Sequence, residues 1–235
     1  MTTIPATNLT LHTSNSTRAV LDMLLPEFER KTGYKVTLIL DTAKNSLARI
    51  KAGERADAAV LLGTSVDALA EMGILTAASR QPFARSTIGM AVLKGAPKPD
   101  ISTVGAFKRT LLNAKSIAHT VHGPSGSYFP RLIEHLGIAE QVKPKTVTRP
   151  GGYIGVVVTA GAAEMAFQQI CELLAVPGLD VVGPIPQEIQ YDFDSKAAIF
   201  AASNNQAAAR ELLNYFARTE NAAEFKAAGL EQLYA

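Results

Sequence analysis

The sequence of 235 residues has no tryptophan and a single cysteine, Cys171. One cysteine cannot form an internal disulfide, and it cannot supply a metal site built from several thiolates. The neighbours of Cys171 are apolar, which favours a small residue of the hydrophobic core over a reactive thiol. We expect neither a metal site nor a cofactor.

Aromatic residues make up only 6% of the chain, and the basic residues are scattered rather than clustered. The formal net charge is +2. Proteins that bind nucleic acids concentrate basic residues in a patch, and many stack bases on aromatic rings. The composition therefore predicts no nucleic-acid partner.

No stretch approaches the run of about 18 apolar residues that a membrane-spanning helix needs. Residues 1–8 contain no basic residue and no apolar run, so they do not resemble a signal peptide. The sequence as written predicts a cytoplasmic protein, or a periplasmic one if a leader has been removed. An apolar fraction of 47% and a charged fraction of 19% are typical of a globular protein.

The chain opens with a predicted strand followed by a predicted helix. Leu9 and Leu11 alternate with polar residues, which is the period of a half-buried strand. Small polar residues at 13–17 predict a turn, after which apolar residues recur at helical spacing until Gly33. The amino end of such a helix favours an anion, because its N–H groups are unpaired and its dipole is positive there. Ordinary helix capping by the same polar side chains is the competing interpretation.

The pattern of strand, polar turn and helix then recurs twice. Strands are predicted at 35–40 and 58–62, with polar turns at 41–45 and 63–65 before the next helices. Three such units predict right-handed βαβ connections in a mainly parallel sheet. Ligands of these sheets bind beyond the carboxyl ends of the strands, where the polar turns would meet.

A second lobe is predicted after the proline-rich segment 94–99, which follows a strand at 86–93. Further strands are expected at 116–121, 146–148 and 163–169, with a Gly/Ser turn at 122–128 and helices at 104–112, 129–136 and 153–160. We therefore predict an α/β protein of two lobes, each a mainly parallel sheet flanked by helices, with the ligand cleft between them. Lobe 1 comprises residues 1–85 and 192–235, and lobe 2 comprises residues 86–191.

Several short motifs resemble those of type II periplasmic solute-binding proteins. The run 28–36 (FERKTGYKV) resembles their FE-x-x-TG-x-x-V, and 53–60 (GERADAAV) is similar to their G-x-x-AD element. The segment 163–167 (AEMAF) resembles the second-lobe counterpart, and Ser125-Gly126-Ser127 before a helix completes an ordered match over nearly the whole chain. The resemblance implies the two-lobed type II periplasmic-binding-protein fold. The branch it indicates is molybdate-binding-protein-like and includes aconitate isomerases, which shift a double bond between cis- and trans-aconitate.

The resemblance also implies ligand residues. Ser16 falls on the family's first-helix ligand serine, and Thr42 falls on its second hydroxyl position. Gln169 stands where molybdate binders carry a tyrosine, and Lys44 and Asn45 replace small residues of the oxyanion turn. A compact dianion bound by neutral donors gains little from an added lysine, whereas a carboxylate does. These departures favour an organic acid with two or three carboxylates over molybdate.

Candidates for contact with the anion lie in the predicted polar turns. They are Ser14, Asn15, Ser16, Thr42, Lys44, Asn45, Ser125, Ser127, Gly152, Tyr153 and Gln169. Helix caps and solvated turns are the competing interpretation for the hydroxyl and amide side chains. Gly152 and Tyr153 could serve only to start a helix, and a structural hydrogen bond is the alternative for Gln169.

His122, Tyr128 and Lys44 are the candidate catalytic residues if the protein is an enzyme. His122 lies in the Gly-rich turn, and histidine side chains generally titrate near neutral pH, as a general acid or base requires. His12, on the opening strand, is expected to be structural. Four arginines could supply a planar fork for a carboxylate, and the sequence does not distinguish among them: Arg18, Arg85, Arg131 and Arg149.

Three classes of function stay open. The first is a monomeric solute-binding protein that carries a small organic anion to the membrane subunits of an ABC transporter if it is exported, with molybdate or another oxyanion as the alternative ligand. The second is an isomerase on the same scaffold, moving a proton allylically in a polycarboxylate. The third is a ligand-sensing domain. Binding is favoured over catalysis, because no strong catalytic signature is present.

Overall fold

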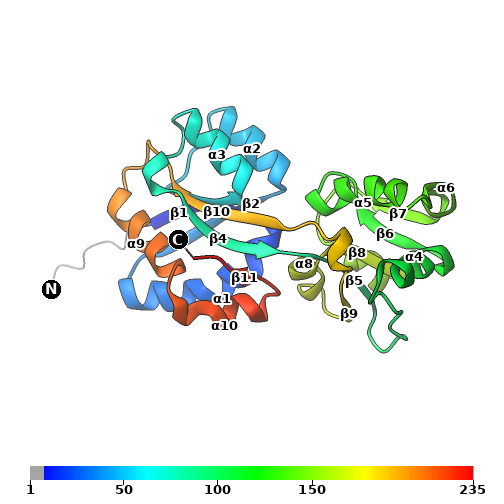
Figure 1. Ribbon diagram of the computed structural model, residues 1–235. Coiled ribbons are helices and arrows are strands. Elements are labelled where there is room, and N and C mark those ends of the chain that lie inside the picture. The colour runs from blue at the N-terminus through cyan, green and yellow to red at the C-terminus, as the bar shows by residue number, and fades with distance from the viewer. Residues whose placement is uncertain (1–7, 235) are drawn as a thin grey trace. The chain divides into compact units, whose positions relative to one another are not determined.

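The computed structural model describes residues 8–234, and the chain forms two compact units (Figure 1). Unit 1 ends at Arg85 and resumes at Phe193, and unit 2 comprises Ser86–Asp192. The return boundary differs by one residue from the predicted one. Within residues 8–234, no helix combines the length and the apolar character that a membrane crossing needs.

Unit 1 is built on a six-stranded sheet with the order β11-β4-β10-β3-β1-β2. The strands are β1 Asn8–Ser14, β2 Lys35–Asp41, β3 Ala58–Leu62, β4 Gln81–Ser86, β10 Phe193–Ile199 and β11 Glu231–Gln232. The pairs β1·β2 and β1·β3 are parallel, while β10 runs antiparallel to β3. The parallel pairs confirm the predicted βαβ units, and β11 also forms an antiparallel pair, with β4.

Helices cover both faces of this sheet (Figure 1). Its helices are α1 Asn15–Thr32, α2 Ala43–Lys51, α3 Gly63–Glu71, α9 Gln206–Phe216 and α10 Ala222–Ala227, with short 3₁₀ turns at Ala77–Ser79 and Thr219–Asn221. The helices α2 and α3 lie on one face, and α1 and α10 lie on the other. The apolar stripe of α1 is buried as its spacing predicts, and Gly33 ends the helix with a left-handed φ of 77°.

Unit 2 is built on a five-stranded sheet with the order β7-β6-β8-β5-β9. Its strands are β5 Ile88–Leu93, β6 Ile117–Thr120, β7 Thr146–Arg149, β8 Met165–Gln169 and β9 Leu179–Pro184. Its helices are α4 Val104–Asn113, α5 Pro124–His135, α6 Ala139–Val142, α7 Gly155–Thr159 and α8 Ile170–Leu174, with 3₁₀ turns at Lys143–Lys145 and Gln187–Ile189. The three strands β6, β7 and β8 are parallel, and β5 is antiparallel to β8 and β9.

The two faces of the unit 2 sheet bury alternate residues of the same strands. Ala118 and Ala166 pack in one core cluster with Ile154 and its neighbours on α7. Phe167 instead lies 4.6 Å, ring centroid to ring centroid, from Phe129 of α5. This alternation is the period of two in a strand that is covered on both faces.

Several predicted loops turned out to be the first turns of helices. The helices α1, α3 and α5 begin at Asn15, Gly63 and Pro124, so the turns expected at 13–17, 63–65 and 122–128 are wrong over much of their length. Small polar residues are compatible with the first helical turn, and proline is already shaped for it. Each of these helices therefore follows its strand after at most three residues.

The parallel register brings the carboxyl ends of neighbouring strands to one edge of each sheet. In unit 1, Ser14 at the end of β1 pairs with Asp41 at the end of β2. In unit 2, Thr120 at the end of β6 pairs with Arg149 at the end of β7. We call these the carboxyl edges of unit 1 and unit 2, and the predicted turns lie on them.

The helix α5 begins in close contact with the end of β6. A Cβ atom built on Gly126 would overlap the carbonyl group of Thr120 and lie 2.6 Å from its Oγ1. One on Gly123 would lie 2.8 Å from the same oxygen. A side chain at residue 126 would therefore force the first turn of α5 away from β6.

We expect Gly126→Ala to lower the free energy of unfolding by about 2 kcal/mol or more, the range of a rigid overpacking clash. The matched control is Gly105→Ala in α4, where a Cβ would meet only the flexible end of Arg109 at 3.5 Å. That control should be neutral, or stabilising by up to about 1 kcal/mol, because alanine favours helix over glycine. Urea denaturation measures both, and equal midpoints for the two variants would contradict the contact with Thr120.

Candidate functional site

The amino end of α1, on the carboxyl edge of unit 1, has no side-chain cap. Its N-cap residue is Ser14, whose hydroxyl lies 3.0 Å from that of Ser16 instead of accepting from a backbone N–H group. The buried Thr17 donates its hydroxyl to the Ser14 carbonyl oxygen. Ser14, Asn15 and Ser16 are half-buried. The structure thus places two hydroxyl groups beside an uncapped helix terminus, which is the arrangement that an anion requires.

The amino end of α2 is capped from within the protein. Thr42 accepts a hydrogen bond from the backbone N–H of Asn45 at 3.3 Å. Asp41 accepts from the backbone N–H of Thr42 at 2.7 Å and from the Asn45 side-chain amide at 3.0 Å. A carboxylate of the chain therefore already occupies this terminus, and ligand contact by Thr42 or Asn45 would have to replace these bonds. Lys44 is exposed on the same turn.

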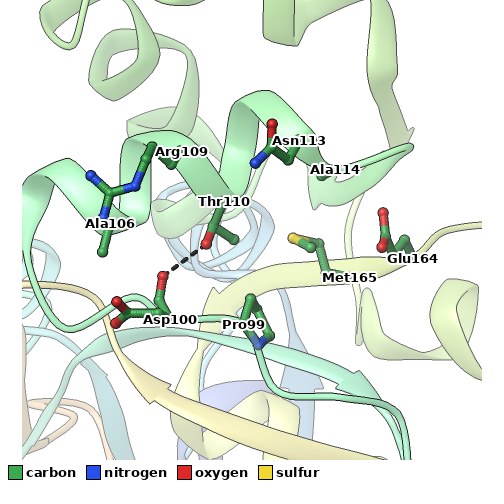
Figure 2. Close-up of a pocket in the computed structure, with 9 residues that line it drawn as sticks. All are labelled: Pro99, Asp100, Ala106, Arg109, Thr110, Asn113, Ala114, Glu164 and Met165. Carbon is green, nitrogen blue, oxygen red and sulfur yellow. Dashed lines mark hydrogen bonds between the residues drawn. The ribbon is translucent and has the colours of Figure 1, made fainter.

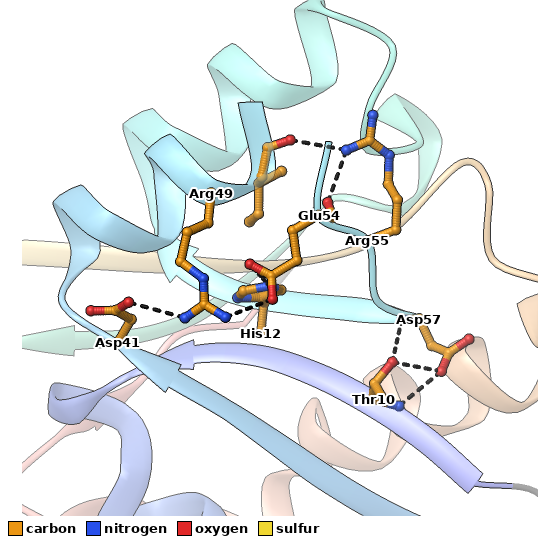
Figure 3. Close-up of polar contacts among 8 residues, drawn as sticks. Thr10, His12, Asp41, Arg49, Glu54, Arg55 and Asp57 are labelled. Carbon is orange, nitrogen blue, oxygen red and sulfur yellow. Dashed lines mark hydrogen bonds and ion pairs between the residues drawn. The ribbon is translucent and has the colours of Figure 1, made fainter. Parts of the chain in front are cut away.

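A chain of charged groups runs from Asp41 into the interior of unit 1 (Figure 3). Arg49 of α2 donates to Asp41 at 3.0 Å and to Glu54 at 2.6 Å. Glu54 in turn lies 3.5 Å from Nε2 of the fully buried His12. Within residues 8–234, neither ring nitrogen of His12 has a hydrogen-bond partner. These contacts between charged side chains fix α2 against β1. They agree with the structural role expected for His12.

The protonation states of Asp41 and His12 follow from the groups around them. Burial alone would raise the pKa of Asp41, but the donors Thr42, Asn45 and Arg49 hold the pKa below its ordinary value. Burial lowers the pKa of His12, although the nearby Glu54 opposes the shift. Asp41 is therefore an anion and His12 is neutral at physiological pH. At α2 the negative charge of Asp41 on the carboxyl edge is paired with the positive charge of Arg49.

The amino end of α5, on the carboxyl edge of unit 2, also has no side-chain cap. Its N-cap is Gly123, and no acidic residue lies in the first turn. Ser125 is buried in that turn, while Ser127 donates its hydroxyl back to the Gly123 carbonyl oxygen at 3.1 Å. The hydroxyl of Thr120, almost fully buried beneath the turn, has no hydrogen-bond partner within residues 8–234. Of the two predicted serines, Ser125 is the one whose hydroxyl has no bond within the helix.

His122 and Arg149 lie side by side on this edge. The backbone N–H of Val121 donates to the Arg149 carbonyl oxygen at 2.8 Å, and that of His122 donates to the Pro150 oxygen at 3.0 Å. The parallel ladder between β6 and β7 thus extends beyond both strands. Both side chains are exposed, and within residues 8–234 neither forms a hydrogen bond or an ion pair. The backbones of His122 and Arg149 therefore lie side by side at the segment that leads into α5.

Gln168 holds the turn that contains Gly152 and Tyr153. Its side-chain amide accepts from the Ile154 N–H at 2.9 Å and donates to the Gly152 carbonyl oxygen at 2.8 Å. Gly152 has a left-handed φ of 83°, which few residues other than glycine adopt. The predicted binding residues Gly152 and Tyr153 thus belong to a braced turn on the carboxyl edge, and their contact with a ligand stays a prediction.

Gln169 faces the interior of unit 2 and is almost fully buried. Its amide oxygen accepts a short hydrogen bond from Ser86, and its nitrogen donates to Glu172 at 3.2 Å. Both ends of the amide are therefore occupied by the protein. Of the two interpretations of Gln169, ligand contact or a structural hydrogen bond, the structure shows the structural hydrogen bond.

Tyr128 lies one turn into α5, away from the carboxyl edge. Its hydroxyl donates to the Ile189 carbonyl oxygen at 2.8 Å, and its ring lies 5.4 Å from that of Tyr191. Burial raises the pKa of Tyr128. It lines a cavity of about 310 Å³ together with Arg131 and His135. This position gives no support to a catalytic role for Tyr128.

The four candidate arginines have different surroundings. Arg18 lies 3.3 Å from Asp22 on the exposed face of α1. Arg85 forms a two-pronged pair with Asp194, at 2.7 and 2.9 Å. Arg131 lies on α5 in the cavity described above, and Arg149 lies on the carboxyl edge of unit 2.

A second cavity, of about 340 Å³, lies at the opposite edge of the unit 2 sheet, where β8 begins (Figure 2). Its polar lining includes Arg109 and Asn113 of α4, with Asp100 and Glu164 facing the same space. The Glu164 carboxylate already accepts from the backbone N–H of Lys115 at 2.6 Å. Two carboxylates beside one arginine make this cavity a poor site for a polycarboxylate.

Sequence reasoning missed three features of the site. Thr120 and Glu172 were not singled out, and neither was the bond from Asp41 to the amino end of α2. The sequence did contain an indication that Glu172 is buried, because it is the single acidic residue in the apolar segment 170–174 (ICELL). The role of Thr120 depends on the approach of α5 to β6, which no local pattern of residues reveals.

Two α/β units joined by two chain crossings, each with strand ends and helix amino ends on one edge, define the class of two-lobed periplasmic binding proteins. The Azotobacter vinelandii periplasmic molybdate-binding protein is similar, with a TM-score of 0.78 and 19% identity over 94% of this chain and 98% of that one. The sulfate-binding protein of Mycobacterium tuberculosis H37Rv has a TM-score of 0.72 and 16% identity over 97% and 87%. At these identities the likeness establishes the fold.

The sequence profile described as "Bacterial extracellular solute-binding protein" matches residues 9–231. The chain belongs to this family. It is also 35% identical, over 97% of its own length and 88% of the relative's, to an aconitate isomerase from a Pseudomonas species. The resemblance to the molybdate-binding-protein-like branch, with its aconitate isomerases, is confirmed.

Glu172 yields a prediction about pH. Burial raises the pKa of Glu172 to about 8, from an ordinary value of 4.5, even though Gln169 and Gln168 donate to it. Between these values the folded chain holds a proton that the unfolded chain releases, so stability falls as pH rises, by at most about 1.4 kcal/mol per pH unit. Glu172→Gln should flatten this slope between pH 5 and 8 and raise the melting temperature at pH 8.

The exposed Glu140→Gln is the matched control and should keep the wild-type pH profile. Thermal melting between pH 5 and 8 measures all three proteins. A Glu172→Gln profile parallel to that of the wild type would show that Glu172 is ionised in the folded protein.

Proposed function

We propose that the chain binds an unsaturated tricarboxylate of the aconitate class and interconverts its cis and trans forms by moving a proton. The observation that carries the proposal is the aconitate isomerase relative, 35% identical over almost the whole chain. The carboxyl edge of unit 2 supports it, because an imidazole, a guanidinium group and an uncapped helix terminus lie together there.

The chemistry needs one acid–base group and a place for negative charge. A base removes a proton from the methylene carbon of aconitate, and the electron pair delocalises over the adjacent double bond and carboxylates. Return of the proton at the other end of the allylic system shifts the double bond and allows the opposite geometry. No atom is gained or lost, so one neutral imidazole can perform both transfers.

We assign the proton transfer to His122 and the stabilisation of charge to the amino end of α5. The N–H groups of the first turn and the Ser125 hydroxyl are donors toward carboxylate oxygens, where the negative charge develops. On unit 1, the uncapped end of α1 with Ser14 and Ser16 is the corresponding donor group. On α2, Thr42 and Asn45 already form hydrogen bonds within the protein, and a ligand that contacts them would have to replace these bonds.

Binding without catalysis is the second candidate function, favoured by the family and by the oxyanion-binding structures that share the fold. An organic acid would then be bound and released unchanged. Export of the chain and docking to ABC-transporter membrane subunits belong to this candidate.

A panel of ligands tests the binding step. We expect cis- and trans-aconitate to raise the melting temperature, because a ligand that binds only the folded state stabilises it. Ser16→Ala should reduce the shift, while the exposed Ser102→Ala, on the opposite edge of unit 2, should not. If molybdate and sulfate stabilise the wild type and aconitate does not, the proposal is overturned.

Proton NMR tests the catalytic step. With cis-aconitate in D₂O, the wild type should form trans-aconitate and exchange allylic protons for deuterium. His122→Ala should lower the rate by about 100-fold or more, the usual contribution of a general base, and retain aconitate binding. His135→Ala, on α5, is the matched control and should keep full turnover. A wild type that binds aconitate and forms no product would favour binding alone.

A further inference from the structure

We propose that Arg149 is the residue that selects polycarboxylates, by binding a second carboxylate of a ligand whose first carboxylate lies at the amino end of α5. The inference rests on the proposed binding of a polycarboxylate and adds the group that discriminates among anions.

The first observation is the lack of a competing anion. Two basic groups of unit 1 are already paired with carboxylates, Arg49 with Asp41 and Glu54, and Lys196 with Asp67. Arg149 is exposed at the end of β7 and has no carboxylate partner within residues 8–234. Its guanidinium group is therefore available to an anion from outside the chain.

The second observation is the position of Arg149. The ladder bonds from Val121 to the Arg149 carbonyl and from His122 to the Pro150 carbonyl fix the end of β7 against the segment that leads into α5. Only Gly123 separates His122 from the first residue of that helix. The acid–base candidate His122 thus lies beside the end of β7 in the ladder and two residues before the first residue of α5 in the sequence.

The third observation concerns the helix terminus itself. The Thr120 hydroxyl is about 99% buried and unpaired, and it lies against Gly123 and Gly126 of the first turn. Together with the Ser125 hydroxyl, this terminus offers donors that are neutral and closely spaced. Such donors suit one carboxylate or one compact oxyanion, and they cannot by themselves distinguish between the two.

Arg149 supplies the distinction. A guanidinium group binds a carboxylate through two parallel N–H···O bonds. A ligand with one anionic group must share its oxygens between the helix terminus and Arg149, whereas a ligand with two or three carboxylates gains a separate second contact. Arg149, at the end of β7, therefore determines whether the site prefers a polycarboxylate to an oxyanion.

The test uses isothermal titration calorimetry with tricarballylate, a saturated tricarboxylate that has no double bond to shift. We expect Arg149→Ala to weaken its binding by about 10- to 100-fold, the usual range for a charge-assisted pair of hydrogen bonds. Arg149→Lys should lose most of the same affinity, because an ammonium group cannot form the fork. Arg109→Ala removes an equal charge at the opposite edge of unit 2 and should bind like the wild type.

Thermal shifts with aconitate and with sulfate complete the test. Arg149→Ala should lose most of the shift with aconitate and keep any shift that sulfate produces in the wild type. If the wild type binds tricarballylate and both Arg149 variants bind it equally well, the inference is overturned while the proposed function stands. A wild type that binds no polycarboxylate overturns both. Equal melting temperatures of the unliganded proteins verify that the variants fold.

Discussion

The site depends on helices that begin almost at once after parallel strands. The amino-terminal N–H groups of a helix have no partners within the helix, so another group must satisfy them. In α1 and α5 the N-cap residue, Ser14 or Gly123, makes no side-chain cap bond, and both helices stand on a carboxyl edge. The fold thereby leaves donors for an anion on each unit, and the glycines of α5 are needed for that arrangement.

The amino end of α2 differs, because side chains of the protein bond there. Its amino end also lies on a carboxyl edge, but Thr42 caps the N–H of Asn45 there, and Asp41 accepts from the N–H of Thr42. Arg49 then neutralises Asp41 and connects it to Glu54, so the negative charge is held in place by the fold. A dianion approaching α2 would meet a carboxylate. The helix dipole favours an anion at every helix amino end. Which of these ends binds an anion therefore depends on the side chains next to it.

Much of the fold could be predicted from the sequence, because the period of apolar residues and the glycine stops are local signals. The strand at 58–62 was predicted with its observed bounds, and the first helix was predicted to stop at Gly33, which is its C-cap. The strand β4 was missed, since Pro82 weakens the pattern and β4 is specified by its pairing with β10 in a distant part of the chain. The first turns were placed too late, because small polar residues are equally at home in loops and in first helical turns.

The site was predicted less completely, for physical reasons. Ser14, Ser16, Ser125 and His122 were chosen because polar residues that follow a strand of a parallel sheet lie on its carboxyl edge, and their contact with a ligand stays a prediction. Whether a polar side chain is already paired depends on partners far away in sequence, as with Gln169, which bonds to Ser86. The same information separates Arg149 from Arg85, whose fork is filled by Asp194 across 109 residues of sequence.

Binding protein and isomerase need the same donors, so the fold and the anion site alone do not separate them. What an isomerase adds is a proton carrier next to the bound anion, in surroundings that do not tie up its nitrogens. Of the buried histidines, His119 bonds to the Thr120 carbonyl oxygen and His12 is enclosed in the core of unit 1, and burial lowers the pKa of both. His122 is exposed, and its backbone is fixed by the ladder to Pro150. A histidine held in this way next to an anion site can carry the proton that the proposed isomerisation moves between two carbons.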